Sequence, residues 1–126
     1  MADVQVHDKI FTPFITAAQI QQRVAEMGAL INTEYAGKKP LLIGVLNGSV
    51  IFMADLLRHI HNGCEIGFIR VSSYQGTSSS GAVKNVMGLN DDLTGRDVII
   101  VEDIIDTGDT AVYLIEEIRK KNPASL

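Results

Sequence analysis

The sequence predicts an α/β protein in which an open, mainly parallel sheet is flanked by helices. Two apolar runs carry this prediction: Leu41–Leu46 and the four β-branched residues Val98–Val101. Continuous runs of this kind are typical of parallel strands that are covered on both faces. Each run is followed by a turn that contains glycine and then by apolar residues at helical spacing, so the strand, loop and helix unit occurs twice.

The N-terminal part of the chain predicts a short strand followed by a packing helix. We expect the strand near Val4–Phe11. Thr16 and Gln19 then have the spacing of a capping box, which places the start of a helix at this point. Apolar residues follow at helical intervals: Ile20, Val24, Met27 and Ile31. Gly37–Pro40 interrupts the pattern before the first apolar run.

The middle of the chain predicts a second helix and a hairpin. The tight turn Asn47–Ser49 leads from the first apolar run into the helix. The inner face of that helix is predicted to hold Met53, Leu56, Leu57 and Ile60. Cys64–Val71 predicts a strand with Glu65 facing outward, and Ala82–Met87 can return as its partner. The alternating apolar residues of the first of these strands are Cys64, Ile66 and Phe68.

The tip of this hairpin, Ser73–Gly81, is predicted to be a loop. Its segment Gln75–Gly81 has almost no apolar side chain to bury and contains two glycines, so we expect it to be mobile. Such a tip is either a passive linker or a lid over a site.

The second apolar run leads directly into an acidic turn, which is the main candidate site. A helix with Ala111, Leu114, Ile115 and Ile118 on one face is predicted from about Thr110 to Lys121. The loop Asp106–Thr110 therefore presents free N–H groups of a helix start together with two threonine hydroxyls, and Gly108 lets an anion approach closely. Ligands of open α/β sheets collect at these strand ends.

Four acids in the same segment would repel a bare phosphate. They are Glu102, Asp103, Asp106 and Asp109. A ligand that carries phosphate, ribose and Mg²⁺ together satisfies every group present. In the alternative interpretation, the carboxylates only end a strand and cap a helix, but capping explains one of these positions and not all of them.

Composition limits the remaining classes of function. The 126 residues, 46% of them hydrophobic, fit one small domain. No apolar run approaches the ~20 residues that span a bilayer, no signal sequence is evident, and the single Cys64 excludes an internal disulfide, so we expect a cytoplasmic protein. Residues 91–110 hold seven acids and one base, and no basic stripe suggests a nucleic-acid surface.

Val101–Gly108, which reads Val-Glu-Asp-Ile-Ile-Asp-Thr-Gly, closely resembles the phosphoribosyl-diphosphate (PRPP) motif of type I phosphoribosyltransferases, in the form found in the hypoxanthine-guanine enzymes. The resemblance runs from about Phe11 to Asn122 and implies their Rossmann-like fold. Leu46–Ser49 matches the family's pyrophosphate-binding loop, and Ser73 with Tyr74 matches the pair that opens its catalytic loop.

This resemblance implies purine salvage: transfer of ribose 5-phosphate from PRPP to the 6-oxopurine hypoxanthine or guanine, giving IMP or GMP and pyrophosphate. It implies that the 5-phosphate is held by Thr107, Gly108, Asp109 and Thr110. Glu102 and Asp103 would hold the ribose hydroxyls and Mg²⁺, while Asn47 and Gly48 face the pyrophosphate. Asp106 would be the general base. Ser73 and Tyr74 would close the lid, and a homo-oligomer, either a dimer or a tetramer, is expected.

Two positions depart from the family pattern. Many relatives place a lysine where Asn47 stands, and a lysine, an arginine or a neutral residue where Asp109 stands. If the Asp109 side chain points toward the phosphate, Asp109→Lys should tighten PRPP binding; if it points away, little should change. The sequence does not decide whether Arg70 braces the lid or meets a phosphate, and it does not reveal the preferred base.

The purine-binding hood that relatives place after Asn122 does not follow here, and Pro123–Leu126 resembles the approach to another strand. We therefore expect a single domain, 1–126, truncated at its C-terminus, which binds PRPP with Mg²⁺ weakly and turns over purine poorly. Two other functions remain open at this point. One is a regulator of the same fold that senses nucleotides and binds RNA, and the other is an inactive module that only binds PRPP.

Overall fold

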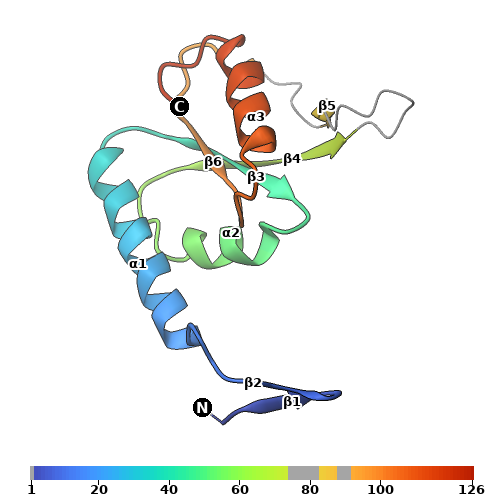
Figure 1. Ribbon diagram of the computed structural model, residues 1–126. Coiled ribbons are helices and arrows are strands. Elements are labelled where there is room, and N and C mark those ends of the chain that lie inside the picture. The colour runs from blue at the N-terminus through green and yellow to red at the C-terminus, as the bar shows by residue number, and fades with distance from the viewer. Residues whose placement is uncertain (1, 74–82, 88–91) are drawn as a thin grey trace.

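The computed structural model describes residues 2–73, 83–87 and 92–126, and it contains three helices and six strands within these ranges (Figure 1). In chain order these are β1 (Val4–Val6), β2 (Lys9–Phe11), α1 (Ala17–Glu34), β3 (Leu41–Leu46), α2 (Val50–Leu57), β4 (Glu65–Ser73), β5 (Val83–Met87), β6 (Val98–Val101) and α3 (Asp109–Arg119). Both apolar runs form strands with the predicted bounds. Of the predicted hairpin tip, Ser73–Gly81, only Ser73 lies within the described residues.

The main sheet has the strand order β5-β4-β3-β6. β3 is central and runs parallel to β4 on one side and to β6 on the other, whereas β5 is antiparallel to β4. Leu46 lies level with Arg70, and Gly44 lies level with Val101. The carboxyl ends of the three parallel strands therefore meet at one edge, and the predicted open, mainly parallel sheet is confirmed.

Helices cover both faces of this sheet (Figure 1). One core cluster joins α3 to the sheet and contains Leu41, Ile43, Val45, Ile69, Leu93, Val98, Leu114 and Ile118. The other joins α1 and α2 to the opposite face and contains Val24, Leu42, Met53, Leu56 and Val101. Successive side chains of a strand point to opposite faces, so a strand that feeds both clusters must be apolar throughout. This is why the strand sequences read as unbroken apolar runs.

The predicted apolar face of β4 is less buried than expected. Ile66 is 51% exposed and Phe68 is 41% exposed, whereas Ile69 on the opposite face is 2% exposed. Helix α2 packs against α1 and, within the sheet, chiefly against β3, so this part of β4 is left partly uncovered. Phe68 lies against Gly44 of β3, where an added Cβ would come within 2.8 Å of its ring. Cys64 is half-buried and packs against the cluster of α1 and α2.

Side-chain hydrogen bonds fix both ends of α1. At its start, Thr16 Oγ1 accepts from the Gln19 N–H at 3.1 Å and Gln19 Oε1 accepts from the Thr16 N–H at 2.8 Å, which confirms the predicted capping box. Near its end, Asn32 Nδ2 donates to the His59 carbonyl at 2.8 Å, and Asn32 Oδ1 accepts from the His61 N–H at 2.9 Å. These bonds tie α1 to the segment that follows α2. Ile60, predicted on the second helix, lies in this segment and still packs on the core.

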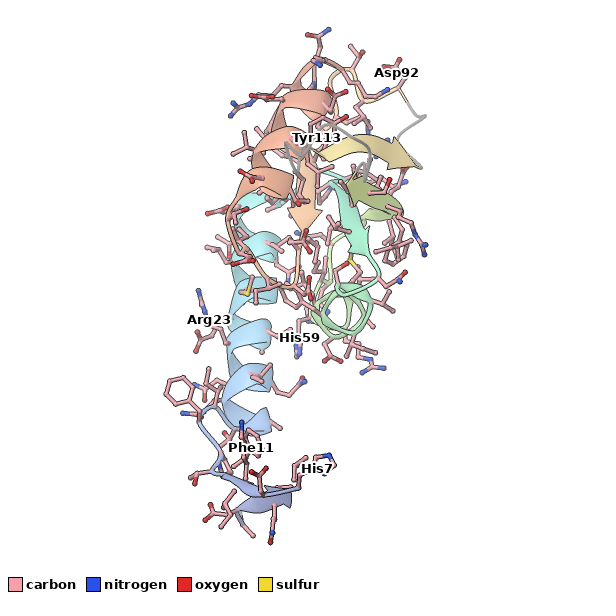
Figure 2. All side chains as sticks on the ribbon, turned by 45° about the vertical axis from the view of Figure 1, so that its right-hand side comes forward. His7, Phe11, Arg23, His59, Asp92 and Tyr113 are labelled. Carbon is pink, nitrogen blue, oxygen red and sulfur yellow. The ribbon has the colours of Figure 1, made fainter. Side chains whose placement is uncertain are left out.

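The N-terminus forms a hairpin rather than a single strand. β1 and β2 pair antiparallel, with Val6 opposite Lys9, and His7 adopts a φ of 56° in the turn between them. Positive φ is what the favoured two-residue hairpin turns require, and it divides the predicted strand in two. All six strand residues are exposed, and the hairpin projects beyond the start of α1 (Figures 1 and 2). Among the described residues, no helix is long and apolar enough to cross a membrane.

Candidate functional site

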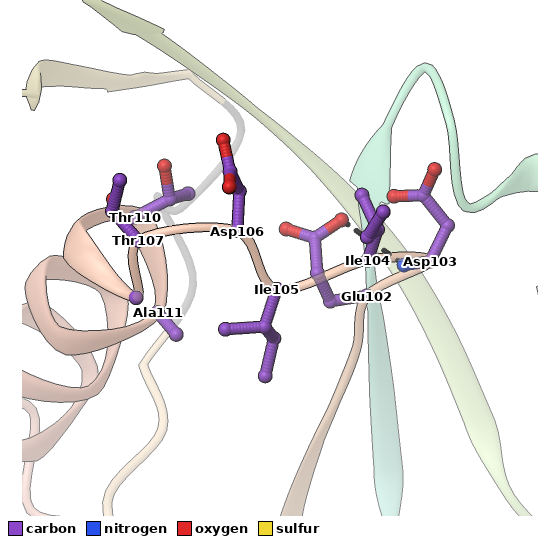
Figure 3. Close-up of a pocket in the computed structure, with 9 residues that line it drawn as sticks. Glu102, Asp103, Ile104, Ile105, Asp106, Thr107, Thr110 and Ala111 are labelled. Carbon is purple, nitrogen blue, oxygen red and sulfur yellow. Dashed lines mark hydrogen bonds between the residues drawn. The ribbon is translucent and has the colours of Figure 1, made fainter.

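A cavity of about 290 Å³ opens where β6 ends and α3 begins (Figure 3). It is lined by Glu102, Asp103, Ile104, Ile105, Asp106, Thr107, Gly108, Thr110 and Ala111. Six of these residues were predicted from the sequence as site residues. The cavity lies at the carboxyl edge of the sheet, where ligands of open α/β proteins bind.

The start of α3 is arranged to receive an anion. Gly108 is the N-cap residue and has a left-handed conformation with a φ of 90°, which a residue with a Cβ rarely adopts. Thr107 Oγ1 accepts a hydrogen bond from the Asp109 N–H at 3.3 Å. Within the described ranges, no residue accepts from the next two N–H groups, those of Thr110 and Ala111. These donors and the positive end of the helix dipole face the cavity region.

Two adjacent carboxylates form the opposite end of the cavity. Glu102 Oε1 accepts a hydrogen bond from the Asp103 N–H at 3.1 Å. Partial burial raises the pKa of the Glu102 carboxyl above its usual value, and the neighbouring Asp103 carboxyl raises it further. Figure 3 shows the Asp103 and Asp106 carboxylates on the same side of the loop. This end therefore concentrates negative charge that a cation or a set of hydroxyl groups would compensate.

This carboxylate pair fits Mg²⁺ in one particular way. In the described part of the chain, no group of three or more His, Cys, Asp or Glu side chains is placed to hold a metal ion. Mg²⁺, however, commonly keeps several waters and is bound through one or two carboxylates together with phosphates of the substrate. Glu102 and Asp103 have the oxygen ligands that the protein's share of such a site requires.

The turn after β3 lies directly beside these carboxylates. A Cβ added to Gly48 would collide with the Asp103 carboxylate, so the two loops are in contact. The peptide bond between Leu46 and Asn47 is cis. Ser49 is fully buried, and its hydroxyl donates to the Val45 carbonyl at 2.7 Å, which ties the turn to the end of β3. The structure thus brings together the two loops that the family resemblance assigned to a single PRPP molecule.

Other predicted site residues are placed differently. Asp109 is the first residue of α3 and is not among the residues that line the cavity. Ser73 is the last residue of β4, and Tyr74 lies outside the described residues. Neither residue is therefore placed relative to the cavity, and their assignment stays a prediction.

Sequence reasoning missed three features of the site. Ile104 and Ile105 line the cavity with 72% and 66% of their surface exposed. The sequence feature that could have identified them is an apolar pair that stands between carboxylates and outside any predicted strand. Ala111 lines the cavity from the first turn of α3. Arg70, left undecided from the sequence, donates from Nη2 to Asn47 Oδ1 at 2.8 Å. That contact depends on the register between β3 and β4, and the sequence does not reveal this register.

Comparisons with known proteins agree on one family. The phosphoribosyl transferase domain matches residues 15–126. The hypoxanthine-guanine phosphoribosyltransferase of Bacillus subtilis (strain 168) is 46% identical over 113 residues, which cover 89% of this chain and 63% of that protein. That of Streptococcus agalactiae (serotype V) is 56% identical over 93 residues, 73% of this chain and 52% of that protein. The chain thus spans about half to two thirds of these relatives. It covers 19% of the bifunctional protein TilS/HprT of Listeria monocytogenes, at 42% identity over 96% of this chain.

Solved structures give the same result. A hypoxanthine-guanine phosphoribosyltransferase from Bacillus anthracis, with a HEPES molecule in its active site, superimposes with a TM-score of 0.80 at 38% identity and covers 94% of this chain and 70% of that one. A hypoxanthine phosphoribosyltransferase variant from Trypanosoma cruzi, complexed with the product IMP, gives a TM-score of 0.79 at 35% identity. The match covers 90% of this chain and 62% of that one.

Proposed function

Because the chain belongs to the phosphoribosyl transferase family, as one of its hypoxanthine-guanine phosphoribosyltransferases, we propose that it binds PRPP with Mg²⁺ for transfer of the ribose 5-phosphate to a 6-oxopurine. The reaction would convert hypoxanthine or guanine to IMP or GMP and release pyrophosphate, which is purine salvage. The observation that carries this proposal is the cavity itself, which joins a free helix start to a carboxylate pair and borders the Gly48 turn.

Each part of PRPP finds chemically suitable groups around this cavity. The 5-phosphate would accept hydrogen bonds from the hydroxyls and N–H groups of Thr107, Gly108 and Thr110. The ribose hydroxyls would bind to Glu102 and Asp103, which would also hold Mg²⁺. When bound, Mg²⁺ would neutralise charge on the departing pyrophosphate. Asn47 and Gly48 would face that diphosphate group from the adjacent turn. Asp109 would contribute its backbone, because its side chain is not part of the cavity lining.

Asp106 is the proposed general base. Its exposed carboxylate lines the cavity between the anion-binding turn and the two isoleucines. It would accept the proton of the purine imidazole nitrogen as the new bond to ribose forms, a role that is typically worth about 10²–10⁴-fold in rate. Ile104 and Ile105 offer an exposed apolar surface on which a flat base could pack. Ser73 and Tyr74 are proposed to close over the bound substrate.

We also propose a cytoplasmic protein that forms a dimer or a tetramer and binds neither a membrane nor nucleic acid. The single cysteine, which cannot form an internal disulfide, suits a reducing compartment. The acidic balance around the site gives nucleic acid no attractive surface there.

The proposal is tested in two steps on the 126-residue chain. Titration calorimetry with PRPP should give a binding signal that requires Mg²⁺ and is lost in Asp103→Asn, while an assay with hypoxanthine then measures IMP formation. Absence of PRPP binding at millimolar concentration would refute the proposed function. Tight binding of RNA that weakens steeply with salt would instead favour a nucleotide-sensing, RNA-binding regulator of the same fold.

A further inference from the structure

The turn that is proposed to face the diphosphate of PRPP carries no positive charge of its own. Residues 46–50 read Leu-Asn-Gly-Ser-Val. On the β6 side the turn touches the Asp103 carboxylate, which suits a metal ion but repels phosphate oxygens. A diphosphate bound here needs a cationic group on some other side of the turn.

Arg70 supplies such a group from the neighbouring strand. It stands on β4, level with Leu46 at the end of β3, and its Nη2 donates to Asn47 Oδ1 at 2.8 Å. The five ion pairs between described residues use other cations: Arg23, Lys39, Arg58, Arg96 and Lys120. Arg70 is exposed, and a guanidinium has five N–H donors, so one bond to Asn47 leaves others for a ligand.

The same hydrogen bond orients the Asn47 amide. Its oxygen is engaged by Arg70, so the group that remains for a ligand is the NH₂, which is a donor. Asn47 and Arg70 together therefore present donors only, without the acceptor oxygen that would repel a phosphate.

We propose that Arg70 is a further pyrophosphate-binding residue, which contacts the diphosphate of PRPP and positions Asn47 to do the same. The inference rests on the proposed function and extends it to a residue of β4. Because β3 lies between β6 and β4, the turn after β3 has Asp103 on one side and Arg70 on the other. Asp103 would then hold Mg²⁺ on one side of the turn, and Arg70 would contact phosphate oxygens on the other.

The test compares three ligands by titration calorimetry on the full chain in the presence of Mg²⁺: PRPP, pyrophosphate and ribose 5-phosphate. In Arg70→Gln we expect affinity for PRPP and pyrophosphate to fall about tenfold or more, because a charge-assisted hydrogen bond is lost. Affinity for ribose 5-phosphate, which lacks the diphosphate, should stay within about twofold. Arg70→Lys, which keeps the charge but loses the planar fork, should lose less.

A double variant separates charge from structure. Asn47→Lys combined with Arg70→Gln places one cation on the turn itself, and it should recover most of the pyrophosphate affinity. The thermal midpoint of each variant, measured by circular dichroism, should stay close to that of the parent chain, because both side chains are exposed.

Equal PRPP affinity in Arg70→Gln and the parent chain would overturn this inference and leave the proposed function intact. Equal weakening of all three ligands, or a marked loss of thermal stability, would show that Arg70 is only a structural brace and would also overturn it. Failure of the parent chain to bind PRPP would refute the proposed function, and the inference with it.

Discussion

At the scale of single residues, Glu102 links the site to pH. Burial and the adjacent Asp103 raise its pKa from the ordinary value of 4.5, so its proton is retained to higher pH in the folded chain than in the unfolded one. The bound proton stabilises the fold below the unfolded pKa, and this contribution is lost as the pH rises through the folded pKa. Mg²⁺ binding requires the deprotonated carboxylate and should therefore strengthen over the same rise in pH.

Glu102→Gln removes this titration. We expect the variant to gain thermal stability relative to the parent chain as pH increases from about 4 to about 8, by no more than about 0.5 kcal/mol because the site is largely solvated. Differential scanning calorimetry across this range measures the effect, with Glu34→Gln on the exposed surface of α1 as the matched control. If the difference in thermal stability between Glu102→Gln and the parent chain does not change with pH, the raised pKa of Glu102 is contradicted.

Asp109→Lys tests the orientation of a side chain that the sequence left open. Because Asp109 does not line the cavity, we expect PRPP affinity to change by less than about threefold at physiological salt, where surface charges are screened. The helix should lose about 0.3–1 kcal/mol, since a carboxylate at its start is replaced by a cation. Calorimetric titration and urea denaturation measure the two effects. Much tighter PRPP binding would show that this position faces the phosphate.

At the scale of elements, the start of α1 depends on its capping box. Thr16→Ala removes the acceptor of the Gln19 N–H and should lower the free energy of unfolding by about 1 kcal/mol. Thr33→Ala is the matched control within the same helix, where the hydroxyl only donates to the Ala29 carbonyl at 3.1 Å and alanine is the better helix former. Urea denaturation should show a clear loss for the first variant and little or none for the second.

The contact between the two site loops gives a second prediction at this scale. Gly48→Ala would push the Asp103 carboxylate out of place, so Mg²⁺-dependent PRPP binding should weaken about tenfold or more. Gly63→Ala, which meets no atom within 4 Å, is the control. Titration calorimetry measures both variants. Normal PRPP affinity in Gly48→Ala would mean that the position of Asp103 does not matter for binding.

These elements also show what the sequence could and could not predict. β3, β6 and the start of α1 were predicted closely because their signals, continuous apolar runs and a capping box, are local. The burial of Ile69 rather than Phe68 depends on where α2 packs, and the bond from Arg70 to Asn47 depends on strand register. Both are tertiary properties. In the site, charged and hydroxyl residues were evident from their types, whereas Ile104 and Ile105 carry no polar group that would mark them as site residues.

At the scale of the whole molecule, the sheet gathers the proposed ligand-binding loops at the carboxyl ends of its parallel strands. The turns after β3 and β6 and the end of β4 meet there, and β3 is covered by helices on both faces. Most of the groups proposed to bind PRPP thus lie in loops that directly follow β3 and β6, two strands that contribute to the core. Rigid support of this kind favours precise placement of ligand groups.

The N-terminal hairpin, by contrast, is exposed, so it should open more readily than the rest of the chain. All residues of its two strands are exposed, and an isolated two-stranded hairpin is marginally stable in water. In D₂O we therefore expect the β1 and β2 amides to exchange their hydrogens long before those of β3, whose exchange requires unfolding of the entire core. Mass spectrometry of peptic fragments would resolve the two rates, and equally slow exchange would mean that something shields the hairpin in solution.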